Sequence, residues 1–412
     1  MNIDYFSNKK IFFLYNHFSK LTNLNVSFSN NLSNEVRTYF KTNKQLGAKD
    51  RKFLAELIFT YYRYLHIIKL YNFNNSEDIF IVIFFISKKV LNNSDTFSYI
   101  LKQFDEFLEK LPKEKVILVK DFLNFVDSNI SKLYPELFSN QIFKINEALF
   151  NTLNSKSPIT IRLLDDNNLD KLQNLFKLNN IDYTLTNLNS INIYTFINFD
   201  TLLSTNNIEY EIQDNGSIII SKIVADISNN NLLDACAGSG GKSLAISSFN
   251  KKVKIDMYDS NINRLNQYYL RNTNNNVNVL NSLNYDKLYD LVLVDSPCSG
   301  SGTIRRHPDK IYTINENILK EFASKQINIL NEYSKFVKKE GILVYVTCSL
   351  FDIENIEVVN KFLENNKNFI PFETKNKLLN DFSLKISNFA NILLPINYDG
   401  DIFFVATMKR IS

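Results

Sequence analysis

Cysteine is scarce in this chain of 412 residues, which contains three: Cys236, Cys298 and Cys348. So few cysteines, in an odd number, do not make a disulfide framework. A lone cysteine is most often a small buried hydrophobe, and that interpretation suits Cys236. It suits Cys298 and Cys348 less well, because each of these thiols follows the end of a predicted strand.

Long apolar runs are also missing. The longest covers residues 79–86, far short of the ~20 residues that a membrane-spanning helix needs. The first ten residues, MNIDYFSNKK, are polar and unlike a signal peptide. We therefore expect a soluble, cytoplasmic protein that does not contact membranes. We expect no metal site, and the lack of coiled-coil or repeat patterns predicts a monomer.

The composition sets broad limits on organisation. A chain of this length favours two or three domains, and 45% hydrophobic residues are enough for well-formed cores. The net charge of +4 is mildly basic. That balance is compatible with a polyanionic partner, but an ordinary surface would produce it about as often.

Residues 1–152 are predicted to be helical. No glycine occurs between Gly47 and Gly216, which is typical of a compact helical bundle. Apolar residues recur at helical spacing over 53–68, and Asp50 is placed to cap that helix. Further helices are expected over 79–90, 97–110, 114–127 and 139–153.

The pattern changes twice after this region. Residues 153–215 predict a small α+β module, with strands at 159–164, 181–185, 191–197 and 208–212 and a helix at 169–178. From Asn230 onward strands and helices alternate, which predicts a parallel, doubly wound sheet. Its strands are expected near 231–234, 253–258, 277–280, 289–294 and 341–346, with a closing hairpin near the C-terminal end.

Three stretches of this last region place reactive side chains just after a predicted strand. They are NNLLDACAGSGGKS from residue 230, YDLVLVDSPCSGSGTIRRHPD at 289–309 and GILVYVTCSL at 341–350. The carboxyl ends of parallel strands meet at one edge of a sheet, where active sites of α/β proteins form. We therefore expect the three stretches to build one site.

The first stretch has the features of a nucleotide-binding turn. Gly238, Gly240 and Gly241 allow close approach of a ligand to the backbone, and the following helix N-terminus suits an anionic group. The spacing is not that of a P-loop. Asp259 follows about 20 residues later, where an acid accepts hydrogen bonds from ribose hydroxyls. Taken alone, Asp259 is better interpreted as a solvated loop residue, but together with the glycine-rich turn the ribose interpretation is favoured.

The motifs DACAGSGGKS, DSPCSGSGTIRRHPD and YVTCS resemble those of the RNA cytosine-5 methyltransferases, most closely the RsmB (Sun, Fmu) branch. Residues 39–64 are similar to the NusB-like RNA-binding domain of that branch, and residues 211–227 resemble its entry helix, with Gln213, Asp214 and Ser217 kept. The resemblance implies a Rossmann-like α/β methyltransferase domain with a mostly parallel seven-stranded sheet over 216–412. A NusB-like all-α domain over 1–152 and a small α+β RNA-binding module over 153–215 would precede it.

The cofactor implied by the resemblance is S-adenosyl-L-methionine. The residues that would bind it are Cys236, Ala237, Gly238, Ser239, Gly240, Gly241, Lys242, Asp259, Asn281 and Asp295. Asn281 stands where the family usually has an aspartate beside the adenine, and an amide oxygen can also accept from an amino group.

The resemblance also implies four catalytic residues. Methylation at carbon 5 of cytosine requires a thiol that adds to carbon 6, so that one difficult step is divided into easier ones. Cys348 would be that nucleophile, and Cys298 would assist release of the methylated base. Asp295 would hold ring N3 and the amino group, with Lys242 nearby. The target base has to leave its stack to reach such a pocket.

A basic cluster follows the second motif and consists of Arg305, Arg306, His307 and Lys310. The resemblance implies that this cluster contacts RNA phosphates, although a solvated surface at a helix start would have the same composition. A second basic cluster lies in the NusB-like stretch and suits either interpretation. It consists of Lys41, Lys44, Lys49, Arg51 and Lys52.

The leading hypothesis is an S-adenosyl-L-methionine-dependent RNA cytosine-5 methyltransferase that acts on 16S ribosomal RNA. One alternative is the same chemistry on transfer RNA or 23S ribosomal RNA. Another is a ribosome assembly factor that binds RNA without turnover. The presence of Lys242, Asp295, Cys298 and Cys348 favours the enzyme.

Overall fold

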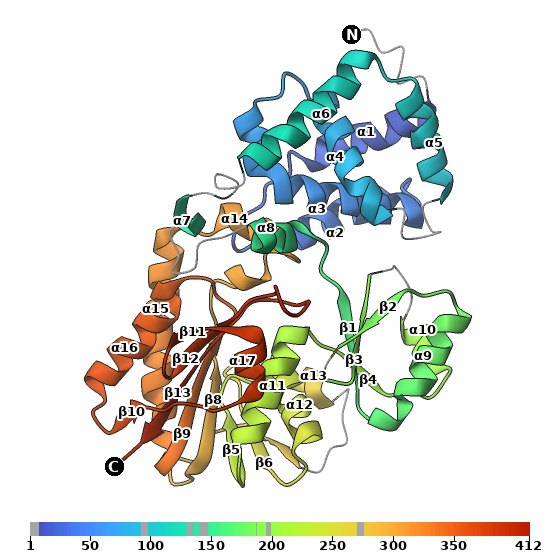
Figure 1. Ribbon diagram of the computed structural model, residues 1–412. Helices are drawn as coiled ribbons and strands as arrows, with labels where there is room; N and C mark the ends of the chain where they lie inside the picture. Colours follow the sequence, from blue (N-terminus) through green and yellow to red (C-terminus); the bar gives the residue numbers. More distant parts are fainter. Residues whose placement is uncertain are drawn as a thin grey trace. The chain divides into compact units, whose positions relative to one another are not determined.

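The computed structural model describes residues 8–91, 98–129, 134, 136–139, 147–186, 188–194, 199–269 and 276–412 (Figure 1). The chain divides into two compact units. Unit 1 takes residues 1–156, 194–197 and 304–313, and unit 2 takes residues 157–193, 198–303 and 314–412. Unit 2 thus contains most of the module expected over 153–215 together with the large sheet. The division into three domains stays a prediction.

Unit 1 is helical where the structure describes it. Its helices are α1 (Lys9–Leu21), α2 (Leu32–Thr42), α3 (Ala48–Tyr71), α4 (Ser76–Leu91), α5 (Ser98–Glu109), α6 (Lys113–Ser128), α7 (Glu136–Ser139), α8 (Glu147–Asn154) and α14 (Lys310–Thr313). Phe84 stacks on Phe104 with ring centroids 3.8 Å apart, and Phe53 packs on the same ring. These fully buried rings place the hydrophobic core between α3, α4 and α5.

The start of α3 differs from the sequence prediction. The N-cap is Gly47, and Asp50 is the third helical residue, whose carboxylate accepts a hydrogen bond from the Gly47 backbone N–H at 3.3 Å. Asp50 therefore stabilises the helix start from inside the helix, as the acidic member of a capping box. Helices α1 and α2 lie in the region that was expected to be helical, although no bounds were predicted for them.

The small module of unit 2 is a four-stranded antiparallel sheet in the order β2-β3-β1-β4. Its elements are β1 (Ile159–Leu163), α9 (Leu169–Leu178), β2 (Tyr183–Leu185), β3 (Ser190–Ile193), α10 (Phe199–Ser204) and β4 (Tyr210–Ile212). Arg162 on β1 is buried. Its guanidinium donates to Gln213 Oε1 at 2.9 Å and to Ser248 Oγ at 3.1 Å, which joins the module to the rest of the unit. Residues 195–197 of a predicted strand lie outside the described residues.

The large sheet of unit 2 contains nine strands, with β10 paired to β13 beside the order β11-β12-β13-β9-β8-β5-β6-β7. Their bounds are β5 (Asn231–Asp234), β6 (Lys254–Met257), β7 (Val277–Val279), β8 (Tyr289–Asp295), β9 (Val337–Thr347), β10 (Phe369–Pro371), β11 (Ser383–Ser387), β12 (Ala390–Leu393) and β13 (Phe403–Arg410). The strands β7, β6, β5, β8 and β9 run parallel, and β13 pairs antiparallel to β9. The expected seven-stranded sheet is present from β7 to β12, and β10 and β11 extend it.

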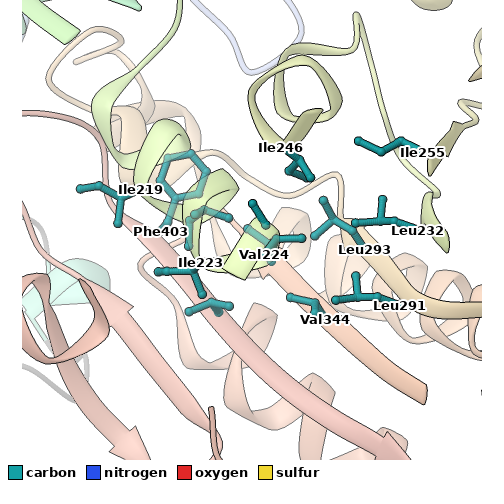
Figure 2. Close-up of a cluster of buried hydrophobic side chains, with 14 of the residues drawn as sticks. Ile219, Ile223, Val224, Leu232, Ile246, Ile255, Leu291, Leu293, Val344 and Phe403 are labelled. Carbon is teal, nitrogen blue, oxygen red and sulfur yellow. The ribbon is translucent and has the colours of Figure 1, made fainter. Parts of the chain in front are cut away.

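Helices cover both faces of this sheet (Figure 1). They are α11 (Asn215–Ile227), α12 (Gly241–Phe249), α13 (Ile262–Tyr269), α15 (Glu316–Tyr333), α16 (Ile356–Asn365) and α17 (Lys377–Phe382). Unit 2 also contains 3-10 turns, which are η4 (Asp166–Asn168) in the small module, η5 (Ser301–Thr303), η6 (Ser334–Phe336) and η7 (Asp352–Glu354). Side chains alternate along a strand, so each strand contributes to two cores. Figure 2 shows the first core, which contains Ile219 and Val224 of α11 together with Leu291 and Leu293 of β8. The second core lies between the sheet and α15 and α16.

No helix among those described is long and apolar enough to cross a membrane.

Candidate active site

The glycine-rich turn joins β5 to α12 and is open on one side. Gly238 and Gly240 have left-handed backbone conformations, with φ of 58° and 83°, which glycine adopts without a steric penalty. A Cβ atom built at Gly238 or at Gly241 would meet no atom within 4 Å. The turn therefore borders free space at the start of α12, where helix N–H groups are available to a ligand.

Asp234, the last residue of β5, was not singled out from the sequence. Its side chain is 1% exposed, Oδ2 accepts a hydrogen bond from Ser243 Oγ at 2.7 Å, and Oδ1 has no hydrogen-bond partner. Burial raises the pKa of this carboxyl group to about 7. A buried acceptor without a partner is costly unless a ligand completes it. The signal that could have found it is an acidic residue directly before the glycine-rich turn.

Asp259 supports the same turn from the end of β6. Its Oδ2 accepts a hydrogen bond from the Gly238 backbone N–H at 2.9 Å, and its Oδ1 accepts one from Asn261 N at 2.8 Å. The turn is thereby held against the neighbouring strand. Asn281, expected beside an adenine, follows β7 and is exposed.

Lys242 and Asp295 form an ion pair, with Nζ 2.6 Å from Oδ2. Burial by itself would lower the pKa of Lys242, but the charge and hydrogen bond of Asp295 outweigh it, and the net shift is upward. The ammonium also lies over the ring of Phe403, 5.0 Å from its centroid. Lys242 therefore stays charged and orients the carboxylate at the end of β8.

The thiols of Cys298 and Cys348 lie together just beyond the carboxyl ends of β8 and β9. These strands are parallel neighbours, and Asp295 pairs with Val346. Cys298 and Cys348 follow them in adjoining loops, with their Sγ atoms 3.4 Å apart. The Gly302 N–H donates to the Cys348 carbonyl at 2.9 Å and holds the loops together. The convergence expected from the sequence is present.

The contact between Cys298 and Cys348 affects the pKa of Cys298. The hydrogen bond to Cys348, together with burial, raises the pKa of Cys298 well above its usual value. Cys298 is therefore a neutral thiol near pH 7. Burial likewise raises the pKa of Cys236 well above its usual value, and this residue packs against the second core, as expected for a small hydrophobe.

The basic cluster after the second motif lies in unit 1, and the structure corrects one of its members. Arg305 is 2% exposed, and its guanidinium donates to Ser155 Oγ at 2.9 Å and to the Lys156 carbonyl at 3.0 Å. This buried side chain holds residues 304–313 against the rest of unit 1. The prediction that Arg305 contacts a phosphate is therefore wrong. Arg306 and Lys310 remain partly exposed.

His307 is also partly exposed. Burial, followed by the charges of Lys310 and Arg306, lowers the pKa of His307 to about 4. It is therefore uncharged near pH 7 and could contact a phosphate only as a neutral donor. Among the described residues, no cluster of three or more His, Cys, Asp or Glu side chains could hold a metal ion.

Comparison with known sequences points to one family. Residues 222–409 match the model of a family described as 16S rRNA methyltransferase RsmB/F. An alignment 217 positions long is 32% identical to the probable ribosomal RNA small subunit methyltransferase B of Bacillus subtilis (strain 168) and covers 49% of this chain and 48% of that protein. The resemblance to the RsmB branch is thus confirmed, and the chain spans about half the length of this relative.

Comparison with solved structures supports the fold. The crystal structure of PH0851 is similar with a TM-score of 0.67 and 19% identity, over 92% of this chain and 94% of that chain. The crystal structure of NSun6 from Pyrococcus horikoshii with SFG is similar with a TM-score of 0.54 and 14% identity, over 68% of this chain and 98% of that chain. These similarities confirm the predicted fold class.

Proposed function

We propose that the chain, whose residues 222–409 match the RsmB/F family, is an S-adenosyl-L-methionine-dependent RNA cytosine-5 methyltransferase acting on 16S ribosomal RNA. The observation that carries this proposal is the pair of thiols 3.4 Å apart at the end of two parallel strands. The names of the RsmB relatives support the ribosomal substrate. The protein would act as a cytoplasmic monomer.

The residues of the glycine-rich turn fit the proposed cofactor. Free space above Gly238 and Gly241 admits a ligand close to the backbone, and the N-terminus of α12 suits the carboxylate of its methionine part. Asp234 Oδ1 is an acceptor without a partner and can take a hydrogen bond from a ligand amino group. Asp259 holds the turn and lies where a ribose is bound in related folds.

When bound, S-adenosyl-L-methionine supplies an electrophilic methyl group on a sulfonium. Cys348 begins the reaction as a thiolate that adds to carbon 6 of the flipped cytosine, which turns carbon 5 into a nucleophile. The charge of Lys242 favours that thiolate, because these two groups interact electrostatically. Asp295, oriented by Lys242, holds N3 and the amino group of the base.

Cys298 completes the reaction by assisting release. After methyl transfer the carbon 5 proton has to leave before the bond between carbon 6 and Cys348 can break. A base takes that proton, and its bonding electrons form the double bond between carbons 5 and 6 as Cys348 leaves as a thiolate. The Sγ of Cys298 lies within hydrogen-bond reach of Cys348 Sγ, so its neutral thiol can donate a proton to the departing sulfur. The raised pKa of Cys298 keeps this residue a neutral thiol, which supports Cys348 as the nucleophile.

Phosphate contacts are proposed for exposed cations of unit 1. Lys41, Lys44, Lys49 and Lys52 are exposed on α2, on α3 and between them, and such residues position a polyanion without reading its sequence. Arg306 and Lys310 join them in this proposal.

The function can be tested by bisulfite sequencing of ribosomal and transfer RNA from cells with and without the gene. We expect one cytosine of 16S rRNA to resist conversion only in cells with the gene, and the wild-type chain, but not Cys348→Ser, to restore the resistance. A change confined to transfer RNA or 23S rRNA would overturn the substrate. Unchanged conversion at every cytosine would overturn the enzyme.

Gly241→Ala is expected to weaken cofactor binding without weakening the fold. The new methyl group meets no protein atom within 4 Å and instead enters the proposed ligand space. Removing a helical glycine stabilises proteins by about 0.4–1 kcal/mol where the backbone allows alanine. We expect the Kd for S-adenosyl-L-methionine, measured by calorimetry, to rise at least ~10-fold, with an equal or higher melting temperature.

The matched comparison is Gly216→Ala. Its Cβ would lie 2.6 Å from the Asp401 carbonyl and 2.8 Å from the Phe403 ring, so this variant should lose stability by overpacking. Wild-type cofactor affinity in Gly241→Ala would contradict the placement of the ligand.

A further inference from the structure

Glu354 is a fully buried carboxylate that the proposed mechanism does not use. It is the last residue of η7, it follows Cys348 by six positions, and its exposed fraction is 0%. No lysine or arginine among the described residues forms an ion pair with it. An isolated buried charge is costly unless hydrogen bonds satisfy it, so the donors around Glu354 indicate what the residue does.

Four hydrogen bonds reach this carboxylate. Oε1 accepts from the Ser299 backbone N–H at 2.7 Å and from Gln326 Nε2 at 3.2 Å. Oε2 accepts from Ser299 Oγ and from Ser349 Oγ, both at 2.5 Å. Such charge-assisted bonds are short and about twice as strong as neutral ones.

The donors come from both thiol loops. Ser299 is the residue after Cys298, and Ser349 is the residue after Cys348. One carboxylate group therefore connects the two loops at points adjacent to the two sulfur atoms.

Glu354 is itself fixed on two sides. Its carbonyl accepts a hydrogen bond from the buried Tyr345 hydroxyl at 2.7 Å. Gln326, fully buried on α15, donates both to its carboxylate and to the Pro297 carbonyl at 3.0 Å. The carboxylate is thus an anchored support, and its position is set by β9 and α15.

We propose that Glu354 is a positioning residue that holds Cys298 and Cys348 at the separation their reaction requires. The inference rests on the proposed function for its consequence in catalysis, while the thiol geometry that it explains is independent of any substrate. A displacement of about 1 Å in a reacting group can cost about 10²-fold in rate. By fixing the positions of the two thiols, Glu354 would therefore affect the turnover rate without contacting the RNA.

The charge of Glu354 has a second effect. It contributes, after the contact with Cys348 and burial, to raising the pKa of Cys298. The same residue that sets the distance between the thiols therefore helps to keep Cys298 protonated.

The thiol geometry can be measured without RNA or cofactor by titration with phenylarsine oxide, which binds two thiols that lie close together. Wild type should bind one arsenical tightly, and Cys298→Ser defines the weak single-thiol signal. Glu354→Asp keeps the charge but is one methylene shorter, so it should fail to reach both loops and lose at least ~10-fold in arsenical affinity. Glu354→Gln keeps the reach and should stay within ~3-fold of wild type.

Enzyme assays distinguish the effect of the length of the Glu354 side chain from the effect of its charge. Glu354→Asp should lower kcat by ~10²-fold with little change in KM. Glu354→Gln should retain most of its kcat, and its pH–rate profile should shift to lower pH because Cys298 then loses a neighbouring negative charge. A Glu354→Asp protein with wild-type arsenical affinity and kcat, or a Glu354→Gln protein as impaired as Glu354→Asp, would overturn the positioning role.

If Glu354→Asp does not fold, two serine variants test the positioning role of Glu354 instead. Ser299→Ala removes a bond beside Cys298 and should slow release, so that covalent protein–RNA complex accumulates. Ser349→Ala removes the bond beside Cys348 and should slow formation of that complex. The matched control is Ser228→Ala, whose buried hydroxyl donates to the Val224 carbonyl at 2.6 Å at the end of α11. Equal effects of all three variants would overturn the proposal.

If wild type binds phenylarsine oxide as expected but transfers no methyl group, the proposed function fails and the positioning of the thiols by Glu354 stands. If methyl transfer is normal and Glu354→Asp behaves as wild type, the positioning role alone fails.

Discussion

Replacing Cys348 by serine is expected to reduce methyl transfer by at least ~10³-fold, the scale of loss when a catalytic nucleophile is removed. A serine hydroxyl does not form an anion near neutral pH, whereas a thiol beside a cation does. Cys348 lies one residue beyond β9, and its electrostatic interaction with Lys242 marks it as the thiol near that cation. The measurement is transfer of a labelled methyl group to 16S rRNA.

The same variant should bind S-adenosyl-L-methionine with wild-type affinity, because no residue of the glycine-rich turn is altered. Calorimetric titration together with the melting temperature separates loss of chemistry from loss of the fold. Retention of more than a tenth of the wild-type rate in Cys348→Ser would show that Cys348 is not the nucleophile.

Replacing Cys298 by serine is expected to trap the reaction after covalent attachment. Addition by Cys348 does not need Cys298, but release does, so complex should build up to one RNA per protein while turnover falls by ~10²-fold or more, the upper part of the range for removing a proton-transfer group. The structural basis is the 3.4 Å separation of the sulfur atoms, which leaves Cys298 as the group beside the bond that must break. Denaturing gel electrophoresis with labelled RNA detects the complex.

The double variant Cys298→Ser/Cys348→Ser is the control for this trap and should form no complex that survives denaturation. Accumulation of complex in Cys348→Ser alone would reverse the two roles. The pKa of Cys298 argues against that outcome, because a thiol whose pKa is raised well above its usual value is a poor source of thiolate near pH 7.

Local patterns predicted the elements of unit 2 well. The helix expected at 169–178 is α9 with the same bounds, and the strand expected at 231–234 is β5. Both follow from side-chain periodicity, which depends only on neighbours in sequence. The two extra strands of the large sheet were missed. β10 has three residues and β11 has two exposed side chains, so neither carries a strong apolar signal.

Residues that act through long-range contacts were predicted less well. A basic residue after a loop was expected to face solvent, but Arg305 is buried against Ser155 and Lys156, about 150 positions earlier. Asp234 and Glu354 were also overlooked. Their importance comes from an acceptor left without a partner in one case and from four converging donors in the other. The position of Asp234 before the glycine-rich turn was a local signal for the first, whereas no spacing in the sequence indicates the second.

The sequence by itself determined which chemical groups stand at the strand ends: a glycine-rich turn, an acid and two thiols, each directly after an apolar run. Only the tertiary structure decided that Cys298 and Cys348, fifty residues apart, lie in contact, and that one buried carboxylate connects their loops. The physical reason is that pairing of β8 with β9 depends on backbone hydrogen bonds and on burial of both sheet faces, which are properties of the folded chain.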